Sequence, residues 1–245
     1  MSWFGYDTAT LERTLALPRV LAETTLPSTM DAAHALAADA APAGTLVLAE
    51  EQRAGRGRGG NRWFSSPRAG IWLTLLERPN DASALEVLSL RVGLRLAPVL
   101  ERWTSQPVQL KWPNDLFVGN AKLAGVLIEV RWREQRPDWV AIGVGVNLIR
   151  PANADARELS TAALDDANAL TVVAELVPAL RAAAFARGPL SAAELAEFAA
   201  RDFTLGRRVS SPSEGTARGI SAQGELLVES AEGIRPFRAG SLVLS

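Results

Sequence analysis

Apolar side chains recur at helical spacing in the stretch from Ser83 to Thr104. They are Leu85, Leu88, Val92, Leu96, Val99 and Trp103. A period of three to four residues predicts an amphipathic helix here. Pro98 lacks a backbone N–H and predicts a kink or an early break near the helix end. A second long helix is predicted over Leu170–Arg187.

Capping residues mark two more helices. One is predicted over Ser28–Ala41, with Ser28 or Thr29 as its N-cap. The other is predicted over Ala192–Phe203, and Ser191 and Glu194 at its start have the spacing of a capping box.

Short apolar runs bounded by turn residues predict strands. Those before residue 150 are Thr45–Glu51, Gly70–Arg78, Val108–Trp112, Gly125–Trp132 and Trp139–Asn147. The connections between the last three are too short for helical crossovers, which favours antiparallel pairing. The predicted fold class is therefore α+β, a mostly antiparallel sheet flanked by helices.

The pattern changes after Leu205. Short strand-like runs separated by Ser, Pro and Gly follow, and they predict a small all-β barrel. A polar loop is predicted over Ala152–Asp166, well before this change. We expect a main domain of residues 1–204 and a C-terminal β domain of residues 205–245.

Composition narrows the class of protein. Of the 245 residues 48% are hydrophobic, enough for a sizeable core, and the formal net charge of −1 gives no general attraction to nucleic acid or anionic membranes. The absence of cysteine excludes disulfides, thiolate metal sites and a cysteine nucleophile. No signal peptide or membrane-length apolar run is present, so a cytoplasmic protein is expected. No metal-ligand spacing occurs. His34, the single histidine, is expected to be structural rather than a general base.

A loop rich in glycine and arginine directly follows the strand over Thr45–Glu51. In its sequence, GRGRGGNRW, the glycines allow close approach to a ligand and present N–H groups to an anion. Arg56 and Arg58 add guanidinium donors for carboxylate or phosphate oxygens. Trp63 offers a flat face on which a purine could stack. We expect the loop to be mobile when empty and ordered when a ligand is bound.

The two lysines of the chain, Lys111 and Lys122, lie in one segment, whereas the other cationic side chains are arginines. Lysine is a compact point charge whose pKa shifts readily on burial, so this clustering indicates a functional choice. Lys111 ends a strand in KWPND, and Asp115 lies where the chain reverses. Gly125, in KLAG, leaves room for a ligand or another backbone.

These motifs, in this order, resemble the signature of biotin protein ligases. The resemblance runs from about residue 26 to 150 through Ser28-Thr29-Met30, Gln52 with GRGRGGNRWFS, KWPNDLFV, KLAGVLIE and GVGVNL. It implies a fold related to class II aminoacyl-tRNA synthetases with an SH3-like C-terminal barrel. The first motif begins at Ser28, so we expect no N-terminal DNA-binding domain.

The resemblance also implies the site. The residues implied to hold biotin are Ser28, Thr29, Gln52, Gly55, Arg56, Arg58, Lys122 and Gly125. Those implied for ATP and the adenylate are Arg56, Arg58, Trp63, Lys111, Asn114, Lys122 and Asn147. The catalytic groups implied are Lys122, Lys111, Arg56, Arg58 and Asp115. Met30 and Gly59 depart from the usual pattern, which has Asn and Arg there.

The activity implied is ATP-dependent. Biotin would be activated as biotinyl-5′-AMP with Mg²⁺-ATP and transferred to a lysine of the biotin carboxyl carrier domain of an acyl-CoA or acetyl-CoA carboxylase. No nucleic acid, membrane or protein-ligated metal is expected, and the chain is a monomer or a homodimer. A lipoate–protein ligase on the same fold is one alternative. A non-catalytic nucleic-acid-binding module, using the Arg–Gly loop and the small barrel, is another.

Overall fold

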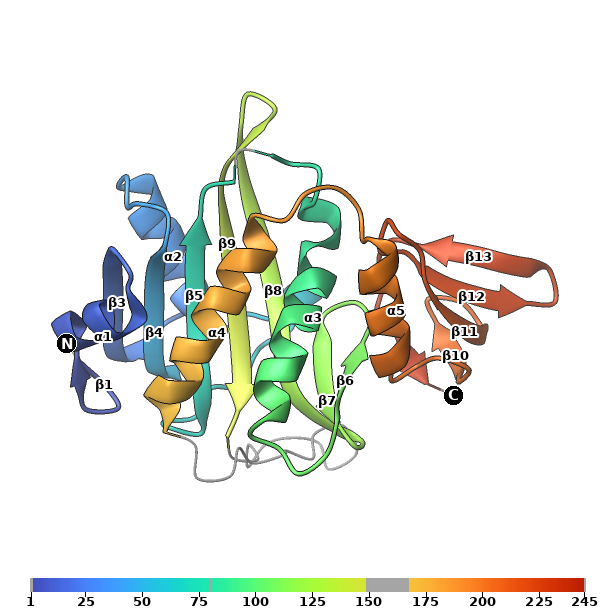
Figure 1. Ribbon diagram of the computed structural model, residues 1–245, viewed down its shortest axis with the longest axis horizontal. Coiled ribbons are helices and arrows are strands. Elements are labelled where there is room, and N and C mark those ends of the chain that lie inside the picture. The colour runs from blue at the N-terminus through green and yellow to red at the C-terminus, as the bar shows by residue number, and fades with distance from the viewer. Residues whose placement is uncertain (1, 80, 149–167, 245) are drawn as a thin grey trace.

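A seven-stranded sheet forms the centre of the molecule (Figure 1). The computed structural model describes residues 2–79, 81–148 and 168–244. The strand order is β3-β4-β5-β9-β8-β7-β6, and neighbours are antiparallel except for β3 with β4. The strands are β3 (Arg19–Leu26), β4 (Thr45–Gln52), β5 (Gly70–Glu77), β6 (Val108–Lys111), β7 (Asp115–Val118), β8 (Ala121–Arg133) and β9 (Arg136–Asn147).

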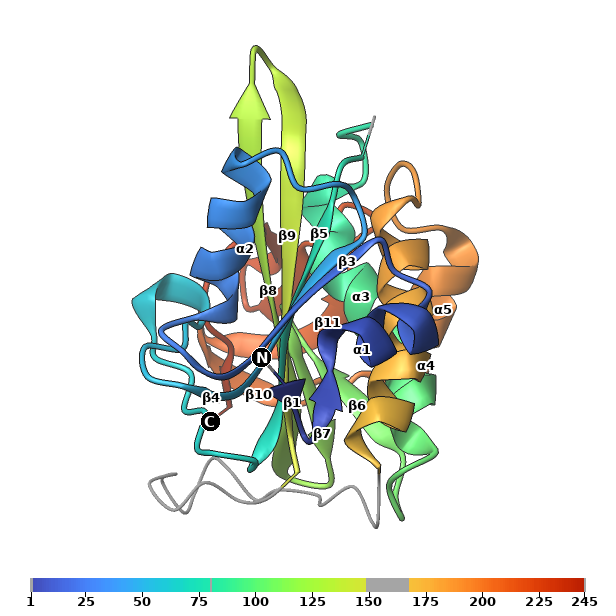
Figure 2. The same cartoon turned by 90° about the vertical axis from the view of Figure 1, so that its left-hand side faces the viewer.

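Helices cover both faces of this sheet (Figure 2). On one face lies α2 (Thr29–Ala38), packed against β4, β5 and β9. On the other lie α1 (Thr8–Leu15), α3 (Leu88–Glu101) and α4 (Ala169–Ala184). Because the central strands have both faces covered, β5 is buried along its whole length, which explains its nearly continuous apolar sequence GIWLTLLE.

The C-terminal strands form a separate five-stranded antiparallel sheet of order β13-β12-β11-β10-β14. They are β10 (Arg208–Ser211), β11 (Gly215–Ile220), β12 (Leu226–Ser230), β13 (Gly233–Phe237) and β14 (Val243–Leu244). The sheet lies beyond β6, next to α5 (Ala192–Arg201) (Figure 1). Its buried Val209, Ala217 and Leu226 belong to the same apolar cluster as the central core. The buried indole N–H of Trp112 donates to the carbonyl of Gly224 at 2.9 Å, which fastens the two sheets together.

The structure confirms the predicted α+β class and the Ser191 capping box. It also confirms the antiparallel arrangement predicted for β6, β8 and β9, although β6 joins β8 through the intervening strand β7. Five elements were not predicted: β3, α1, β7, and the pair β1 (Ser2–Trp3) and β2 (Tyr6–Asp7). The helix predicted from Ser83 starts instead as a 3-10 turn at Leu85–Val87 and continues past Pro98 without a break. The loop predicted over Ala152–Asp166 lies outside the described residues. Closure of the C-terminal sheet into a barrel stays a prediction.

A buried ion pair joins α3 to α5. The Arg91 side chain is 2% exposed, and its Nε donates to Oε1 of Glu194 at 2.6 Å. The same guanidinium donates to the carbonyls of Gly188 and Pro189. Glu194 also accepts from the backbone N–H of Ser191 in the capping box. The carboxylate of Glu194 therefore caps the start of α5 and also links α5 to α3.

This pair makes stability sensitive to acid. Hydrogen bonds from Arg91 hold the pKa of Glu194 at about 2, against 4.5 for the ordinary group. A carboxyl with a depressed folded pKa stabilises the fold above about pH 4.5, and its contribution is lost as the pH falls toward 2. The shift corresponds to about 3 kcal/mol. We expect denaturant unfolding to show this loss between pH 4.5 and 2.5. In Glu194→Gln the free energy of unfolding should fall by about 2 kcal/mol less over the same pH interval. Equal losses in both proteins would contradict the assignment.

Candidate active site

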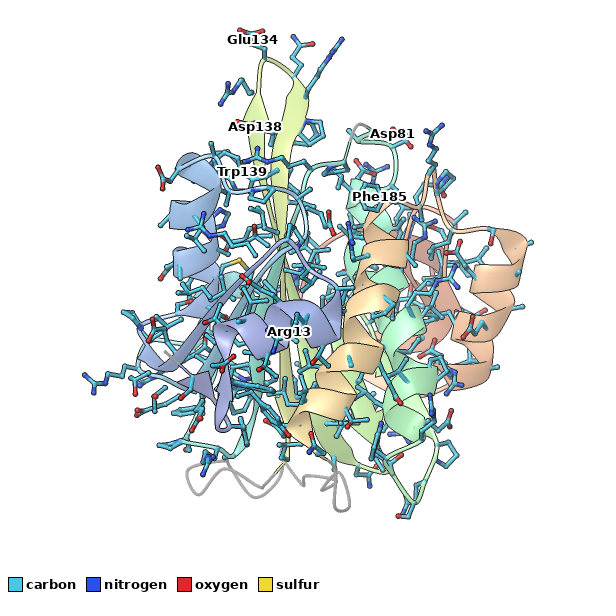
Figure 3. The ribbon with its side chains drawn as sticks, turned by 60° about the vertical axis from the view of Figure 1, so that its left-hand side comes forward. Arg13, Asp81, Glu134, Asp138, Trp139 and Phe185 are labelled. Atoms are coloured by element: carbon cyan, nitrogen blue, oxygen red, sulfur yellow. The ribbon has the colours of Figure 1, made fainter. Side chains whose placement is uncertain are left out.

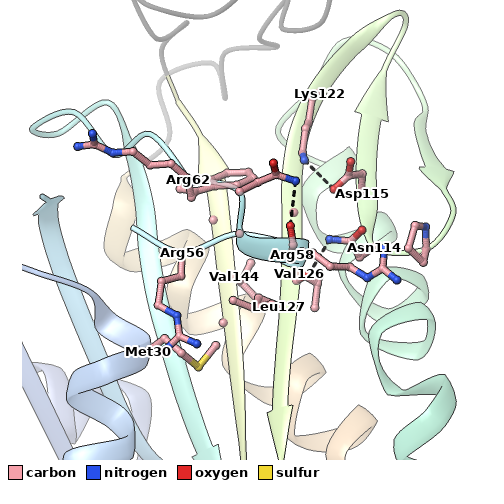
Figure 4. A pocket seen from close by; sticks show the side chains of 18 of the residues that line it. Met30, Arg56, Arg58, Arg62, Asn114, Asp115, Lys122, Val126, Leu127 and Val144 are labelled. Atoms are coloured by element: carbon pink, nitrogen blue, oxygen red, sulfur yellow. Dashed lines mark hydrogen bonds and ion pairs between the residues drawn. The ribbon is translucent and has the colours of Figure 1, made fainter. Parts of the chain in front are cut away.

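A cavity of about 340 Å³ opens on the α2 face of the central sheet (Figure 4). It lies between α2, the loop that follows β4, the strands β8 and β9, and the segment just before β14. Side chains of 18 lining residues are drawn in Figure 4. The predicted site residues that line it are Ser28, Thr29, Gln52, Arg56, Arg58, Trp63, Lys111, Asn114, Asp115, Lys122 and Gly125. Residues as far apart in the sequence as Ser28 and Gly125 thus meet at one cavity.

Sheet glycines form the floor of this cavity. A Cβ atom on Gly145 would lie 2.5 Å from the Trp63 indole, and one on Gly125 would lie 2.7 Å from the same ring. A Cβ atom on Gly143 would lie 2.7 Å from the methyl group of Met30. Real Cβ atoms do not approach so closely. The absence of side chains at these three positions therefore lets Trp63 and Met30 lie directly on the sheet.

One end of the cavity is lined by neutral polar groups. The backbone N–H and the hydroxyl of Thr29 both donate to Oε1 of Gln52, at 2.8 and 3.0 Å. The amide of Gln52 donates to Ser65, and the hydroxyl of Thr74 donates to that of Thr29. The hydroxyl of Ser28 is buried and has no hydrogen-bond partner among the described residues. An orphaned hydroxyl at a cavity wall is available to a polar ligand.

The other end is cationic. The ammonium of Lys122 lies 2.7 Å from Oδ1 of Asp115, and both side chains are 20% exposed. The same ammonium lies 4.9 Å from the centre of the Trp63 ring. Lys111 lies over the ring of Phe117 at 5.3 Å. These contacts fix compact positive charges at the mouth of a partly dry site, where electrostatic interactions are stronger than in water.

The glycine- and arginine-rich loop roofs the cavity. Its backbone forms a narrow hairpin, with Trp63 donating to Gly55 at 2.9 Å and Gly57 donating to Asn61 at 2.8 Å. Arg56 and Arg58 leave the loop in opposite directions (Figure 4). Arg58 donates to the carbonyl of Gly240 at 2.6 Å, which ties the roof to the C-terminal segment.

A second, more open hollow of about 670 Å³ adjoins the first. The two share Arg62, Trp63, Lys111, Asp115 and Lys122 among their lining residues. The second hollow also includes Asn147, Phe117, Phe203 and Arg207, and the rings of Phe117 and Phe203 are stacked at 4.7 Å. Its lining carries more cationic than acidic side chains, so an anionic group of a ligand fits there.

Two predicted residues lie elsewhere than the first cavity. Gly55 is at the base of the loop, where a Cβ atom would meet the Trp63 carbonyl at 2.4 Å. Asn147 lines the second hollow and donates to the carbonyl of Lys122 at 3.1 Å. Thr74, Arg62 and the wall formed by Ser241–Val243 also line the cavity and were not predicted as site residues. For the glycine floor, Gly125 was predicted as a place of close approach, whereas GVGVN, which contains Gly143 and Gly145, was only a weak signal.

No group of three or more side chains able to hold a metal ion occurs among the described residues. No helix in the described part of the chain is long and apolar enough to cross a membrane. The arrangement suits a ligand with a neutral polar head at the Ser28 end, an acidic group near Lys122, and a second anionic part in the adjoining hollow.

The comparisons with known proteins agree with this geometry. The sequence model described as "Biotin/lipoate A/B protein ligase family" matches residues 21–147, and the one described as "Biotin protein ligase C terminal domain" matches residues 204–245. The chain therefore belongs to the biotin/lipoate A/B protein ligase family. The resemblance found in the sequence motifs is confirmed.

Three relatives show the extent of the likeness. The bifunctional ligase/repressor BirA of Escherichia coli is 33% identical over 82% of this chain and 66% of its own. The biotin–[acetyl-CoA-carboxylase] ligase of Mycobacterium tuberculosis is 31% identical over 76% of this chain and 73% of its own. The fold of the Aquifex aeolicus biotin protein ligase, solved with biotin and ATP, superposes with a TM-score of 0.78 at 24% identity, covering 94% of this chain and 100% of that one. The matched region spans 40 to 67% of the four BirA relatives.

Proposed function

We propose that this chain is a biotin protein ligase. It activates biotin with Mg²⁺-ATP as biotinyl-5′-AMP and transfers the biotinyl group to a lysine of the biotin carboxyl carrier domain of an acyl-CoA carboxylase. The observation that carries the proposal is the polarity of the cavity: a neutral polar pocket ends at the orphaned Ser28 hydroxyl, and Lys122 lies at the opposite end.

The polar end suits the ureido ring of biotin. This ring carries one carbonyl and two N–H groups. The hydroxyl of Ser28 can donate or accept, and the amide of Gln52, whose oxygen already accepts from Thr29, can donate its second N–H. The apolar side chains of Met30, Leu127 and Val144 line the cavity and suit the fused rings and the aliphatic chain of biotin. The biotin carboxylate then points toward Lys122.

In the first step, a carboxylate oxygen of biotin attacks the α-phosphorus of ATP. A P–O bond forms, the bond to the bridging oxygen breaks, and pyrophosphate leaves. Negative charge grows on the phosphate oxygens, and the ammoniums of Lys122 and Lys111 stabilise it. Trp63 stacks on adenine, and Asn147 and Asn114 lie beside the nucleotide. Mg²⁺ would arrive bound to the phosphates of ATP.

In the second step, the amine of the carrier lysine attacks the carbonyl of the mixed anhydride, a C–N bond forms, and AMP leaves. The attacking nitrogen must lose a proton, and its proposed acceptor is Asp115, which is paired with Lys122 at 2.7 Å. Arg56 and Arg58 hold the loop over the reactive anhydride and limit access by water. A carrier protein is the expected partner, and the cytoplasm is the expected compartment.

The biotin reading is favoured over lipoate because the C-terminal domain matches the biotin ligase model over residues 204–245. The test is to mix the purified protein with biotin, Mg²⁺-ATP and a carrier domain and to weigh the carrier by mass spectrometry. We expect a gain of one biotinyl group on the carrier. A carrier modified only when lipoate replaces biotin would overturn the substrate assignment.

Trp63→Ala tests the adenine contact. We expect ATP binding to weaken about tenfold or more, because stacking of a base on an aromatic ring contributes roughly 1–3 kcal/mol. Biotin binding should fall less, since the polar groups around Ser28 are untouched. Calorimetry with each ligand measures both. Equal losses of affinity for ATP and biotin would show that removing the indole disturbs the whole site and does not remove a specific contact with adenine.

A further inference from the structure

His34 lies on α2, outside the lining of both hollows, and both of its ring nitrogens have partners. The indole N–H of Trp139 donates to Nδ1 at 2.9 Å. On the other side of the ring, Nε2 lies 2.9 Å from Oε2 of Glu129. The imidazole side chain is 16% exposed. The single histidine of the chain thus bridges a tryptophan of β9 and a carboxylate of β8.

These partners determine the tautomer. An indole N–H can only donate, so Nδ1 of His34 must be the unprotonated nitrogen. The ring proton of the neutral imidazole therefore lies on Nε2 and is donated to Glu129. His34 consequently supplies Glu129 with one directed hydrogen bond.

Trp139 is itself held in place. The guanidinium groups of Arg78 and Arg131 lie 5.7 and 6.0 Å from its ring centre. Arg78 is fixed by hydrogen bonds to the carbonyls of Ala37 and Ala41 at the end of α2. Figure 3 shows Trp139 at the base of the projecting β8–β9 hairpin, beside α2. The orientation of His34 is therefore set by a rigid group.

Glu129 uses its second oxygen to bind the loop. Oε1 of Glu129 accepts from one terminal nitrogen of Arg56, and Oδ1 of Asp31 accepts from the other at 2.5 Å. Burial lowers the pKa of Arg56, but the hydrogen bond to Asp31 and the charge of Glu129 raise it above its ordinary value. The arginine is thus held as a cation between α2 and β8. It lies beside Met30 at one end of the cavity (Figure 4).

We propose that His34 and Glu129 are positioning residues for Arg56: His34 orients the carboxylate, and the carboxylate pins the loop arginine so that the roof closes the end of the cavity beside Met30. The proposal rests on the proposed function in one respect: it takes the end of the cavity beside Met30 as the place where the biotin ring binds. A closed roof there slows the escape of biotin and of the adenylate. The roof is then held at two points, by Arg56 here and by Arg58 at Gly240.

Two readouts test the proposal in Glu129→Gln, which keeps the shape of the side chain and removes its charge. The first needs no ligand: an arginine-specific protease should cut the loop at Arg58 or Arg62 about tenfold faster than in the parent. A charge-assisted hydrogen bond at a site 39% exposed supports an effect of about this size. The second is kinetic: the KM for biotin should rise about tenfold while kcat changes less than threefold.

Further variants separate positioning from general damage. His34→Phe should loosen the loop several-fold, and His34→Gln, which retains an N–H for Glu129, should restore most of the protection. Glu229→Gln removes a carboxylate from a comparably exposed pair with Arg218 in the C-terminal sheet and should leave the loop unchanged. The double variant Arg56→Ala, Glu129→Gln should be no looser than Arg56→Ala alone.

The proposal would be overturned if the protease cut the loop of Glu129→Gln at the parental rate. It would also be overturned if the cleavage rate of the double variant rose by the product of the two single effects. A parent protein that forms no biotinyl-AMP would instead overturn the proposed function. The protease result would still decide the role of Glu129 and His34, because it requires no substrate.

Discussion

Lys122→Arg is expected to reduce adenylate formation by roughly 10²- to 10³-fold, the usual cost of losing one fixed donor to a transition state. The charge is retained, but the shape is not. Lys122 is packed against Trp63 and paired with Asp115, and its side chain is only 20% exposed. The planar guanidinium of an arginine is wider than an ammonium, so it must displace either the indole or the phosphate.

Pyrophosphate release with biotin and ATP measures this effect. Lys122→Met, which removes the charge but fits the space, should be impaired to a similar or greater degree. The melting temperature of both variants should stay close to that of the parent, because Lys122 is not part of the apolar core. Pyrophosphate release by Lys122→Arg at nearly the parental rate would remove Lys122 from its proposed role.

Arg91→Ala is expected to destabilise the protein by about 3–5 kcal/mol, the typical cost of leaving one partner of a buried ion pair uncompensated. Glu194 would lose its hydrogen-bonded guanidinium, and the carbonyls of Gly188 and Pro189 would lose their donor. For a chain of this length the melting temperature should fall by roughly 10 °C. Differential scanning calorimetry or denaturant unfolding measures the change.

Arg218→Ala is the matched control. Its guanidinium pairs with Glu229, but both side chains are more than 40% exposed, so less than about 1 kcal/mol should be lost. Arg91→Met separates charge from volume: an apolar replacement that fills the space should recover part of the loss when combined with Glu194→Gln. Equal stability changes for Arg91→Ala and Arg218→Ala would show that the buried pair stabilises the protein no more than the exposed pair does.

The sequence was sufficient for the elements with a strong local pattern. The apolar run of β5 and the helical period of α3 are local, and so is the capping box of α5. It was insufficient where the pattern is short or mixed. In β3, RVLAETTL, only Val20 and Ala22 are buried, so the alternation is weak. Helix α1 has two buried leucines in eight residues, and tertiary packing rather than local preference stabilises it.

The residues of the site also divide into those that the sequence could predict and those that it could not. Motifs such as KWPND and GRGRGG could be found because their residues are contiguous in the chain. The wall at Ser241–Val243 could not, because those residues have ordinary side chains and reach the cavity only through the fold. Gly143 and Gly145 were ambiguous until Met30 and Trp63 were seen to lie on them. His34 gave no sequence signal, since its role depends on partners 95 and 105 positions away.

The hydrogen bond between Arg58 and Gly240 joins residues 182 positions apart. At synthesis rates of about 5–20 residues per second, the ribosome makes Gly240 roughly 10–40 seconds after Arg58. A growing chain can therefore contain the polar pocket, the glycine floor and both lysines while its roof still has no anchor on that side. If the chain forms biotinyl-AMP as proposed, only the Arg56 contacts hold the roof until Gly240 is in place, so the capacity to retain the intermediate is completed last.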